Sequence, residues 1–299
     1  MSKEIKKSKK DRTPLRKTLE FLKNLFFAAI AALLIKTFLI ETSRVPTGSM
    51  ERTILVGDFL FVNKFIYGSS SPRNIPFTNI ALPYFQLPAL TEPSKGDIIV
   101  FEYPGDRDEL QPREILSYVK RCIGAPGDTL EIKHKVVYIN GEEARRPPNI
   151  QYLMPQILPK SYTRPDIFPK GSGWNKDNYG PIIIPKKGDI VNLTPENIET
   201  YRMLINRNYG KNVVQVSNGK IFIDGKETDN YEIPQDYFFA MGDNRDDSAD
   251  SRYWGFVPRE KIIGEALMIY WSWNPEIPFA NFFKLLGSTR FNRIAKLVH

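Results

Sequence analysis

The chain has 299 residues, and its 41% hydrophobic and 12% aromatic content is ordinary for a folded protein of one large or two modest domains. Its net charge of +8 is concentrated at the two ends, because residues 1–23 carry +6, residues 284–299 carry +4 and the remainder carries −2. A nucleic-acid-binding protein would carry a basic patch on its folded body, so this distribution argues against a nucleic-acid partner.

A basic tail, residues 1–20, leads into residues 21–40, whose centre is apolar and free of charge. Twenty helical residues span roughly 30 Å, about the thickness of a bilayer core, so we predict a transmembrane anchor. Lys23 and Lys36 lie near its ends, where long side chains can reach the interface. The positively charged tail should stay in the cytoplasm, which places the chain after residue 40 on the outer face.

A cleaved secretory signal and an interfacial helix are the alternatives to a membrane span. Against cleavage, no Ala-x-Ala-like site follows the apolar run, and the chain continues as Glu41-Thr42-Ser43-Arg44. We therefore expect a single-pass anchor with a short cytoplasmic tail.

The chain beyond residue 40 consists of short β-type runs interrupted by Gly, Pro and Asp. Asn140-Gly141 and Asp224-Gly225 are strong hairpin-turn signals. These patterns predict a mainly β fold, in which the N-terminal helix is followed by a twisted antiparallel, barrel-like catalytic core. The clearest strand candidates are residues 59–62, 97–101, 136–139, 213–216, 221–223 and 266–271.

We assign the catalytic core to residues 41–141 and 236–299. Residues 142–235, rich in Pro, Asn, Tyr and Lys, are predicted to form an inserted β-rich lobe with a short helix near 195–206. The proline-containing segment 68–93 is expected to be an exposed excursion.

Two segments marked by glycine carry the candidate chemistry, one around Ser49 and one around Lys120. A serine hydroxyl is a weak nucleophile unless a neighbouring base takes its proton. Histidine is the usual base, but the chain has only His134, between two lysines, and His299 at its end. A lysine variant of the serine-hydrolase arrangement is the natural interpretation.

Cys122 is the only cysteine, so a disulfide within the chain is impossible. The sequence also has no Cys/His cluster of the zinc type. We therefore expect neither a metal nor a cofactor.

An ordered set of motifs from the anchor to the C-terminal Arg290-Phe291-Asn292-Arg293-Ile294 resembles the successive motif boxes of bacterial type I signal peptidases. The last box is long enough to make chance agreement negligible. The boxes are Pro46-Thr47-Gly48-Ser49-Met50, Gly57-Asp58-Phe59, Lys95-Gly96-Asp97-Ile98-Ile99-Val100-Phe101, the segment from Tyr118 to Asp128, and the segment from Met241 to Pro258.

The resemblance implies that Ser49 is the nucleophile and Lys120 the general base. It also implies an oxyanion hole formed by the main-chain N–H of Ser49 and the hydroxyl of Thr47, at a position where the family often has serine. Ser248 corresponds to a hydroxyl that orients the lysine, while Asp250 and Arg252 match a supporting pair.

The same resemblance suggests shallow pockets for the small residues of the substrate. Two departures from the family pattern are Asp247, at a position that is commonly Asn, and Arg52, at one that is commonly Pro. The pocket candidates are Val45, Pro46, Met50, Ile54, Tyr118 and Val119.

A working Lys120 must be neutral, which requires burial to lower its pKa from about 10.4. Strand alternation then predicts that Arg121 faces away. Only nine residues separate Ile40 from Ser49, at most ~30 Å of extended chain, so the nucleophile should work close to the membrane. Secretory signal peptides present a small-x-small cleavage site there.

We therefore predict a membrane-anchored serine endopeptidase of the bacterial cytoplasmic membrane that removes signal peptides through an acyl-enzyme. Its predicted partners are preproteins that bear signal peptides and membrane lipid, and the translocation machinery is a further candidate partner. Aromatic residues favour membrane interfaces, and the candidates for lipid contact are Trp271, Trp273, Phe279, Phe282 and Phe283.

Two alternative functions fit part of the sequence. A self-cleaving transcriptional repressor shares Ser/Lys chemistry, but the first forty residues hold an apolar span and leave no room for a helix-turn-helix. A membrane-anchored β-domain that only scaffolds other proteins is the non-enzymatic alternative, and the intact Ser49 and Lys120 argue against it.

Overall fold

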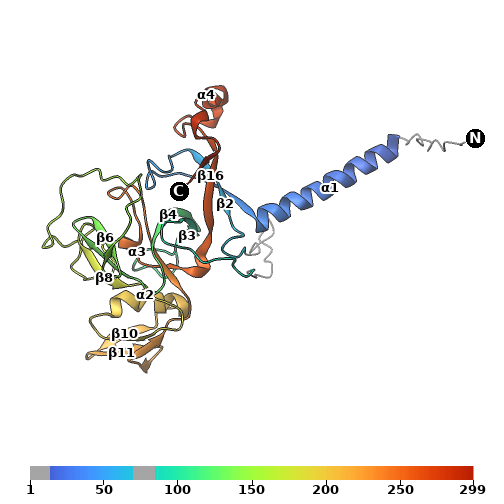
Figure 1. Cartoon of the computed structure of the whole chain (residues 1–299). Coiled ribbons are helices and arrows are strands. Elements are labelled where there is room, and N and C mark those ends of the chain that lie inside the picture. The colour runs from blue at the N-terminus through green and yellow to red at the C-terminus, as the bar shows by residue number, and fades with distance from the viewer. Residues whose placement is uncertain (1–13, 70–84, 86, 299) are drawn as a thin grey trace, which may run out of the picture.

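The structure, a computed structural model, describes residues 14–69, 85 and 87–298, so most of the basic tail and much of the 68–93 excursion lie outside the described residues. A long helix, α1 (Pro14–Phe38), extends alone from the body of the molecule (Figure 1). Its residues Arg16–Phe38 are long and apolar enough to cross a membrane, and none of its most apolar part is buried.

The helix ends two residues before the predicted boundary at residue 40. Ile40 is the first residue of strand β1 (Ile40–Arg44), which pairs antiparallel with β2 (Asp58–Asn63). Strand pairing therefore determines the end of the helix, because the apolar run itself continues through Leu39 and Ile40.

An antiparallel sheet of eight strands forms the centre of the molecule, in the order β1-β2-β16-β3-β4-β14-β15, with β17 added beside β16. Its longest strand, β16, has register shifts against both of its neighbours. Such bulges bend a strand and increase its twist, and the sheet is curled into a half-barrel. The remaining strands are β3 (Ile98–Glu102), β4 (Ser117–Gly124), β14 (Tyr237–Met241), β15 (Val257–Pro258), β16 (Ile262–Ser272) and β17 (Lys296–Leu297).

Three smaller sheets lie beside the central one, so the predicted β-rich character of the inserted lobe is confirmed. The order in the four-stranded sheet is β7-β6-β5-β8, while β10-β11-β12 form a hairpin sheet and β9 pairs with β13. Two strands of the four-stranded sheet precede residue 142, and the boundaries 142–235 stay a prediction. The strands are β5 (Thr129–Lys133), β6 (Val136–Ile139), β7 (Glu142–Glu143), β8 (Tyr179–Ile183), β9 (Ile190–Asn192), β10 (Val214–Ser217), β11 (Lys220–Ile223), β12 (Lys226–Glu227) and β13 (Asn230–Glu232).

All six predicted strand segments overlap observed strands. Both predicted hairpin turns are also present: Asn140 and Gly141 have φ of 53° and 85°, and Asp224 and Gly225 have φ of 50° and 79°. Two successive residues with positive φ are what a type I′ turn requires.

The helices are few and short apart from α1. The helix predicted near 195–206 is α2 (Ile198–Tyr209), which ends at Gly210 in the left-handed conformation. The others are α3 (Ser251–Trp254), α4 (Phe282–Gly287) and the 3₁₀ turns η1 (Arg259–Lys261), η2 (Phe279–Asn281) and η3 (Phe291–Arg293).

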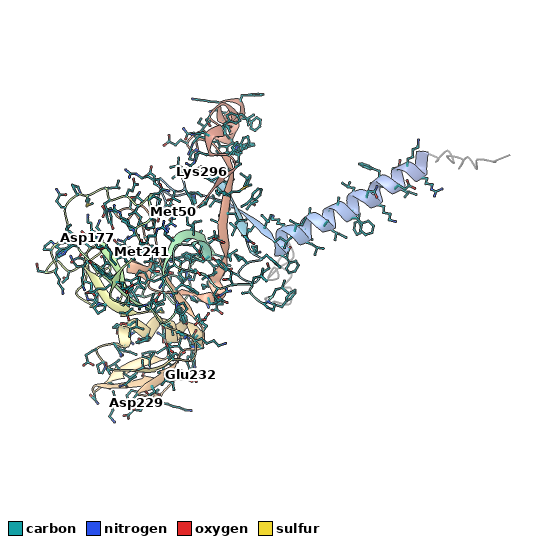
Figure 2. All side chains as sticks on the ribbon, in the orientation of Figure 1. Met50, Asp177, Asp229, Glu232, Met241 and Lys296 are labelled. Atoms are coloured by element: carbon teal, nitrogen blue, oxygen red, sulfur yellow. The ribbon has the colours of Figure 1, made fainter. Side chains whose placement is uncertain are left out.

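The apolar core lies in three clusters, and one of them supports the segment between β1 and β2. Met50 and Ile54 of that segment are at most 1% exposed and pack with Leu60, Val100 and Ile269 of the central sheet. Figure 2 shows Met50 within the body of the molecule, beside the central sheet. Burial of two apolar side chains stabilises this turn by about 1.5–3 kcal/mol for each side chain.

Candidate active site

Ser49 lies in the turn between β1 and β2. The turn is closed by hydrogen bonds from Glu51 N–H to Gly48 O at 2.9 Å and from Ile54 N–H to Met50 O at 2.8 Å. Because Met50 and Ile54 anchor the turn in the core, the position of Ser49 against the sheet is fixed.

Lys120, from β4, meets Ser49 across 71 residues of sequence. Its Nζ forms a hydrogen bond of 2.6 Å with Ser49 Oγ and a longer one of 3.3 Å with Val119 O. The lysine is 4% exposed, and its Nζ lies 5.2 Å from the centre of the Tyr118 ring. The predicted burial of Lys120 is confirmed, and Arg121, the next residue, pairs with Asp243 rather than with Ser49.

Burial lowers the pKa of Lys120 to about 8, and the negative charge of Asp250 opposes this shift only in part. Desolvation disfavours the charged form of a lysine, so a substantial fraction of Lys120 is neutral in mildly alkaline solution. A neutral amine within hydrogen-bond reach of a serine hydroxyl can accept its proton.

The loop that follows β14 holds the turn of Ser49 from the other side. Asn244 donates from its main-chain N–H to Ser49 O at 3.0 Å and from its side-chain amide to Gly48 O at 3.1 Å. Asp243 accepts from Thr53 Oγ1 at 2.6 Å and from Arg121 through two hydrogen bonds of 2.9 and 2.7 Å.

Sequence analysis missed the support that Asp243, Asn244 and Thr53 provide. The available signal was their position, because Asp243 and Asn244 belong to the long 241–258 motif and Arg121 follows Lys120 directly. Which residue each would contact depends on the packing of strands that are distant in sequence.

Asp250 and Arg252 form a fully buried pair at the end of the same loop. Arg252 donates to both carboxylate oxygens of Asp250 at 2.8 Å, and Gly242 N–H donates to Asp250 at 3.1 Å. Burial alone would raise the pKa of Asp250, but the charge and hydrogen bonds of Arg252 outweigh it and hold this pKa below its ordinary range. The pair therefore fixes the shape of the loop, in agreement with a supporting position.

Comparison with known proteins gives the family. The family model described as "Signal peptidase, peptidase S26" matches residues 18–271. The chain belongs to the signal peptidase S26 family. It is 32% identical over 268 residues to a "Signal peptidase I" of Buchnera aphidicola subsp. Acyrthosiphon pisum, covering 85% of this chain and 76% of that protein.

Two further members of the signal peptidase family show the same extent of similarity. A "Signal peptidase I" of Rickettsia massiliae is 31% identical, covering 90% of this chain and 88% of that protein. One of Pseudomonas aeruginosa is 29% identical, covering 85% of this chain and 72% of that protein. Membership in this family makes the chain a serine peptidase.

The contact expected between Ser248 and the amine of Lys120 is not formed in this signal peptidase. The buried Ser248 Oγ forms no hydrogen bond of ordinary geometry among the described residues, but it lies close enough to the Asp250 carboxylate to help lower the pKa of that group. The hydroxyl packs against the main chain, because a Cβ placed on Gly242 would lie 2.3 Å from Ser248 Oγ and 2.5 Å from Ser49 O. The orienting role of Ser248 stays a prediction.

Of the two groups expected to form the oxyanion hole, one is an unused donor on a buried residue and the other lies on an exposed residue. Within the described residues, the main-chain N–H of Ser49 donates to no protein acceptor, and Thr47, two residues earlier, is exposed. An unused N–H beside the nucleophile is a group that can bind developing negative charge.

The six residues expected to line the substrate pockets of this signal peptidase separate into two groups. Pro46 is exposed, and Tyr118 and Val119 are half-buried. The other three, Val45, Met50 and Ile54, belong to the core, so they can support a pocket wall only from behind.

Both departures from the family pattern lie in or against the turn of Ser49. Arg52 has a φ of 74°, a left-handed conformation that proline cannot adopt. The carboxylates of Glu51 and Asp247 lie 3.8 and 4.0 Å from the position of a Cβ on Gly48, so two negative charges lie close to this turn. Among the described residues, no group of three or more His, Cys, Asp and Glu side chains is arranged to hold a metal ion.

Proposed function

We propose that Ser49 and Lys120 perform signal-peptide removal in this member of the signal peptidase family. The family acts on preproteins that bear signal peptides, and the proposal adds the residues and the mechanism. The observation that carries it is the 2.6 Å hydrogen bond between the Ser49 hydroxyl and a buried lysine whose pKa is lowered to about 8.

In the proposed reaction, the neutral amine of Lys120 takes the proton of Ser49 as the oxygen attacks the scissile carbonyl. The N–H of Ser49 and the hydroxyl of Thr47 stabilise the oxyanion, and protonated Lys120 then gives its proton to the leaving amine. The products of this first stage are the free amino terminus of the mature protein and an ester between Ser49 and the signal peptide. Lys120 next takes a proton from water, which attacks the ester; the bond to Ser49 Oγ breaks, the signal peptide leaves with a free carboxylate, and Lys120 returns the proton to Ser49 Oγ.

We also propose that α1 anchors the catalytic domain in the bacterial cytoplasmic membrane, with the basic tail inside and the domain outside. The tail is positively charged, and the helix is apolar and unburied. Ser49 follows the end of β1 by only five residues, which keeps the nucleophile near the anchor. This position suits a substrate whose cleavage site follows a membrane-inserted segment.

A second lipid contact is proposed at α4 and the turn before it. Phe279 and Phe283 are 72% and 88% exposed, and exposed aromatic side chains of this size favour a membrane interface. In Figure 1, α4 lies at the top and α1 extends to the right, so both lie away from the β10–β11 hairpin at the lower left. Trp271 belongs to β16 and Trp273 follows that strand, and their rings meet edge-to-face.

The test is mass spectrometry of a preprotein with a small-x-small site after incubation with the detergent-solubilised enzyme. Cleavage should occur after the second small residue and should be lost in Ser49→Ala and in Lys120→Ala. Lys160→Ala, at an exposed lysine, is the matched control and should cleave normally. Cleavage by the Ser49→Ala enzyme would contradict the proposed nucleophile, and a folded unmodified protein that cleaves nothing would favour the scaffold function.

A further inference from the structure

A large cavity lies beside the C-terminal half of β4, and neither Ser49 nor Lys120 lines it. It has a volume of about 860 Å³, within the range of small-molecule sites. Arg121, Cys122 and Ile123 of β4 contribute to its wall, whereas Lys120 does not. The turn between β5 and β6, strand β6 and the segment 142–157 form most of the rest, with Lys95, Gly96 and Arg245, so the site is distinct from the proposed catalytic pair.

Arg245 lines this cavity with a guanidinium group that has no counter-charge. The residue is 3% exposed, and its Nε has no hydrogen-bond partner. No ion pair joins Arg245 to a carboxylate within the part of the chain that the structure describes. Burial lowers the pKa of Arg245, and the charges of Asp250 and Asp243, which form no ion pair with it, oppose this shift only in part.

The buried carboxylates nearest to Arg245 are already paired with other cations. Asp243 accepts two hydrogen bonds from Arg121, and Asp250 accepts two from Arg252. Three buried arginines therefore face two carboxylates, and one positive charge is left on Arg245. A buried charge of this kind is costly unless an anion compensates it.

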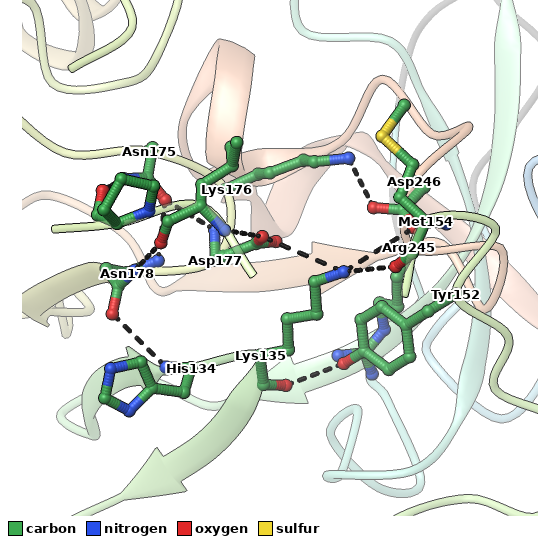
Figure 3. Close-up of polar contacts among 12 residues, drawn as sticks. His134, Lys135, Tyr152, Met154, Asn175, Lys176, Asp177, Asn178, Arg245 and Asp246 are labelled. Atoms are coloured by element: carbon green, nitrogen blue, oxygen red, sulfur yellow. Dashed lines mark hydrogen bonds and ion pairs between the residues drawn. The ribbon is translucent and has the colours of Figure 1, made fainter. Parts of the chain in front are cut away.

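A neighbouring group of charges is balanced without Arg245 (Figure 3). Lys176 pairs with Asp246, and Lys135 lies 3.8 Å from Asp177 and 4.0 Å from Asp246. Lys135 also donates to Met154 O at 2.6 Å. Two lysines thus share two carboxylates, and neither carboxylate is available to the arginine. In Figure 3, Arg245 lies beside Tyr152, and its guanidinium group takes part in none of the hydrogen bonds and ion pairs drawn as dashed lines.

The remaining wall of the cavity is largely apolar. Val137, Ile139 and Ile150 line it and are buried, whereas Met154 and Ile157 line it and are 54% and 47% exposed. A ligand that satisfies both features has one anionic group for the guanidinium and an apolar body for this wall. Arginine recognises planar carboxylates through two parallel hydrogen bonds.

We propose that this cavity binds a small organic acid with an apolar body, whose carboxylate pairs with Arg245. The site would act in addition to the proposed peptidase function and does not depend on it.

The probes for the test are 4-phenylbutyrate, the neutral 4-phenylbutanol and inorganic phosphate. Each is titrated into the full-length enzyme in a non-ionic detergent by isothermal calorimetry, with the titration into detergent alone subtracted. The acid should bind one-to-one and at least tenfold more tightly than either the alcohol, which lacks the charge, or phosphate, which lacks the apolar body. Equal affinities of acid and alcohol, of acid and phosphate, or no binding of the acid, would overturn the proposal.

Two variants and a control identify the site. Arg245→Gln should weaken binding of the acid at least tenfold and leave the alcohol unchanged, while Arg145→Gln, at an exposed arginine on the cavity rim, should change binding of the acid less than threefold. If Arg245→Gln does not fold, Ala144→Phe is the second variant. Its larger side chain narrows the cavity from a partly exposed part of the wall and should weaken the binding of the acid and of the alcohol to the same extent. Unchanged binding of the acid in a folded Arg245→Gln or Ala144→Phe enzyme would refute the assignment.

Discussion

The pH dependence of cleavage tests the proposed role of Lys120 most directly. If its neutral amine is the general base, kcat/KM should rise with pH and level off above the pKa of Lys120. The perturbation is therefore pH itself, applied between pH 6 and pH 10 to the unmodified enzyme.

The structure gives the magnitude of this effect. Burial lowers the pKa of Lys120 from 10.5 to about 8, a change worth about 3.4 kcal/mol between the two protonation states. The neutral fraction then rises from about one in eleven at pH 7 to about ten in eleven at pH 9, so kcat/KM should increase about tenfold over this range. An unperturbed lysine would instead give a rise that continues to pH 10 and beyond.

The assay is the cleavage of a fluorescence-quenched peptide with a small-x-small site, at substrate concentrations well below KM. The Thr47→Val enzyme is the control, because it should be slower at every pH and keep the same midpoint. A flat profile, or a rise with no inflection below pH 9.5, would refute the assignment of Lys120 as a buried base.

Four further predictions concern stability and rate. Lys120→Met removes an amine whose protonation opposes folding most strongly below pH 8, so the free energy of unfolding of the variant minus that of the unmodified protein should be about 3 kcal/mol larger (variant more stable) at pH 7 than at pH 10.5 in urea titrations. An equal difference at both pH values would contradict the lowered pKa. Thr47→Val should lower kcat roughly 10²-fold with an unchanged Tm, and an unchanged kcat would remove Thr47 from the oxyanion hole. Gly242→Ala should lower Tm and kcat/KM together, because its Cβ would lie 2.3 Å from the nearest hydroxyl oxygen, a clash that costs about 1–3 kcal/mol. Gly287→Ala, which has open space around it, is the control and should not lower Tm. Arg52→Gly should stabilise the protein by about 1 kcal/mol by relieving the left-handed φ, whereas Arg52→Pro should destabilise it; the reverse order of their Tm values would show that the turn adopts a different conformation.

The main elements of the fold were predictable because their signals are local. Apolar runs bounded by turn residues identified β2, β3 and β16, and Asn140-Gly141 identified a hairpin. The end of α1 was not predictable in this way. Its apolar sequence continues to Ile40, and only the pairing of Ile40 with Asn63 determines where the helix stops.

The candidate site was predictable only in part, for a similar reason. The motifs identified Ser49 and Lys120, which the structure places 2.6 Å apart. The contacts of Ser248 and the missing ion pair of Arg245 depend on which residues, distant in sequence, the fold places next to each side chain. Counting charges along the sequence cannot show this, because the sequence does not say which arginine each carboxylate will pair with.

The strand order of the central sheet also has a consequence for the timing of assembly. Ser49 precedes β2 and Lys120 lies on β4, but β16, from the last eighth of the chain, stands between β2 and β3. The two halves of the pair are therefore joined through a strand that is synthesised after both of them. We expect a nascent chain arrested before residue 262 to hold Ser49 and Lys120 apart and to remain unreactive towards serine-directed acylating agents, so that a growing chain cannot cleave itself or its neighbours before synthesis is nearly complete.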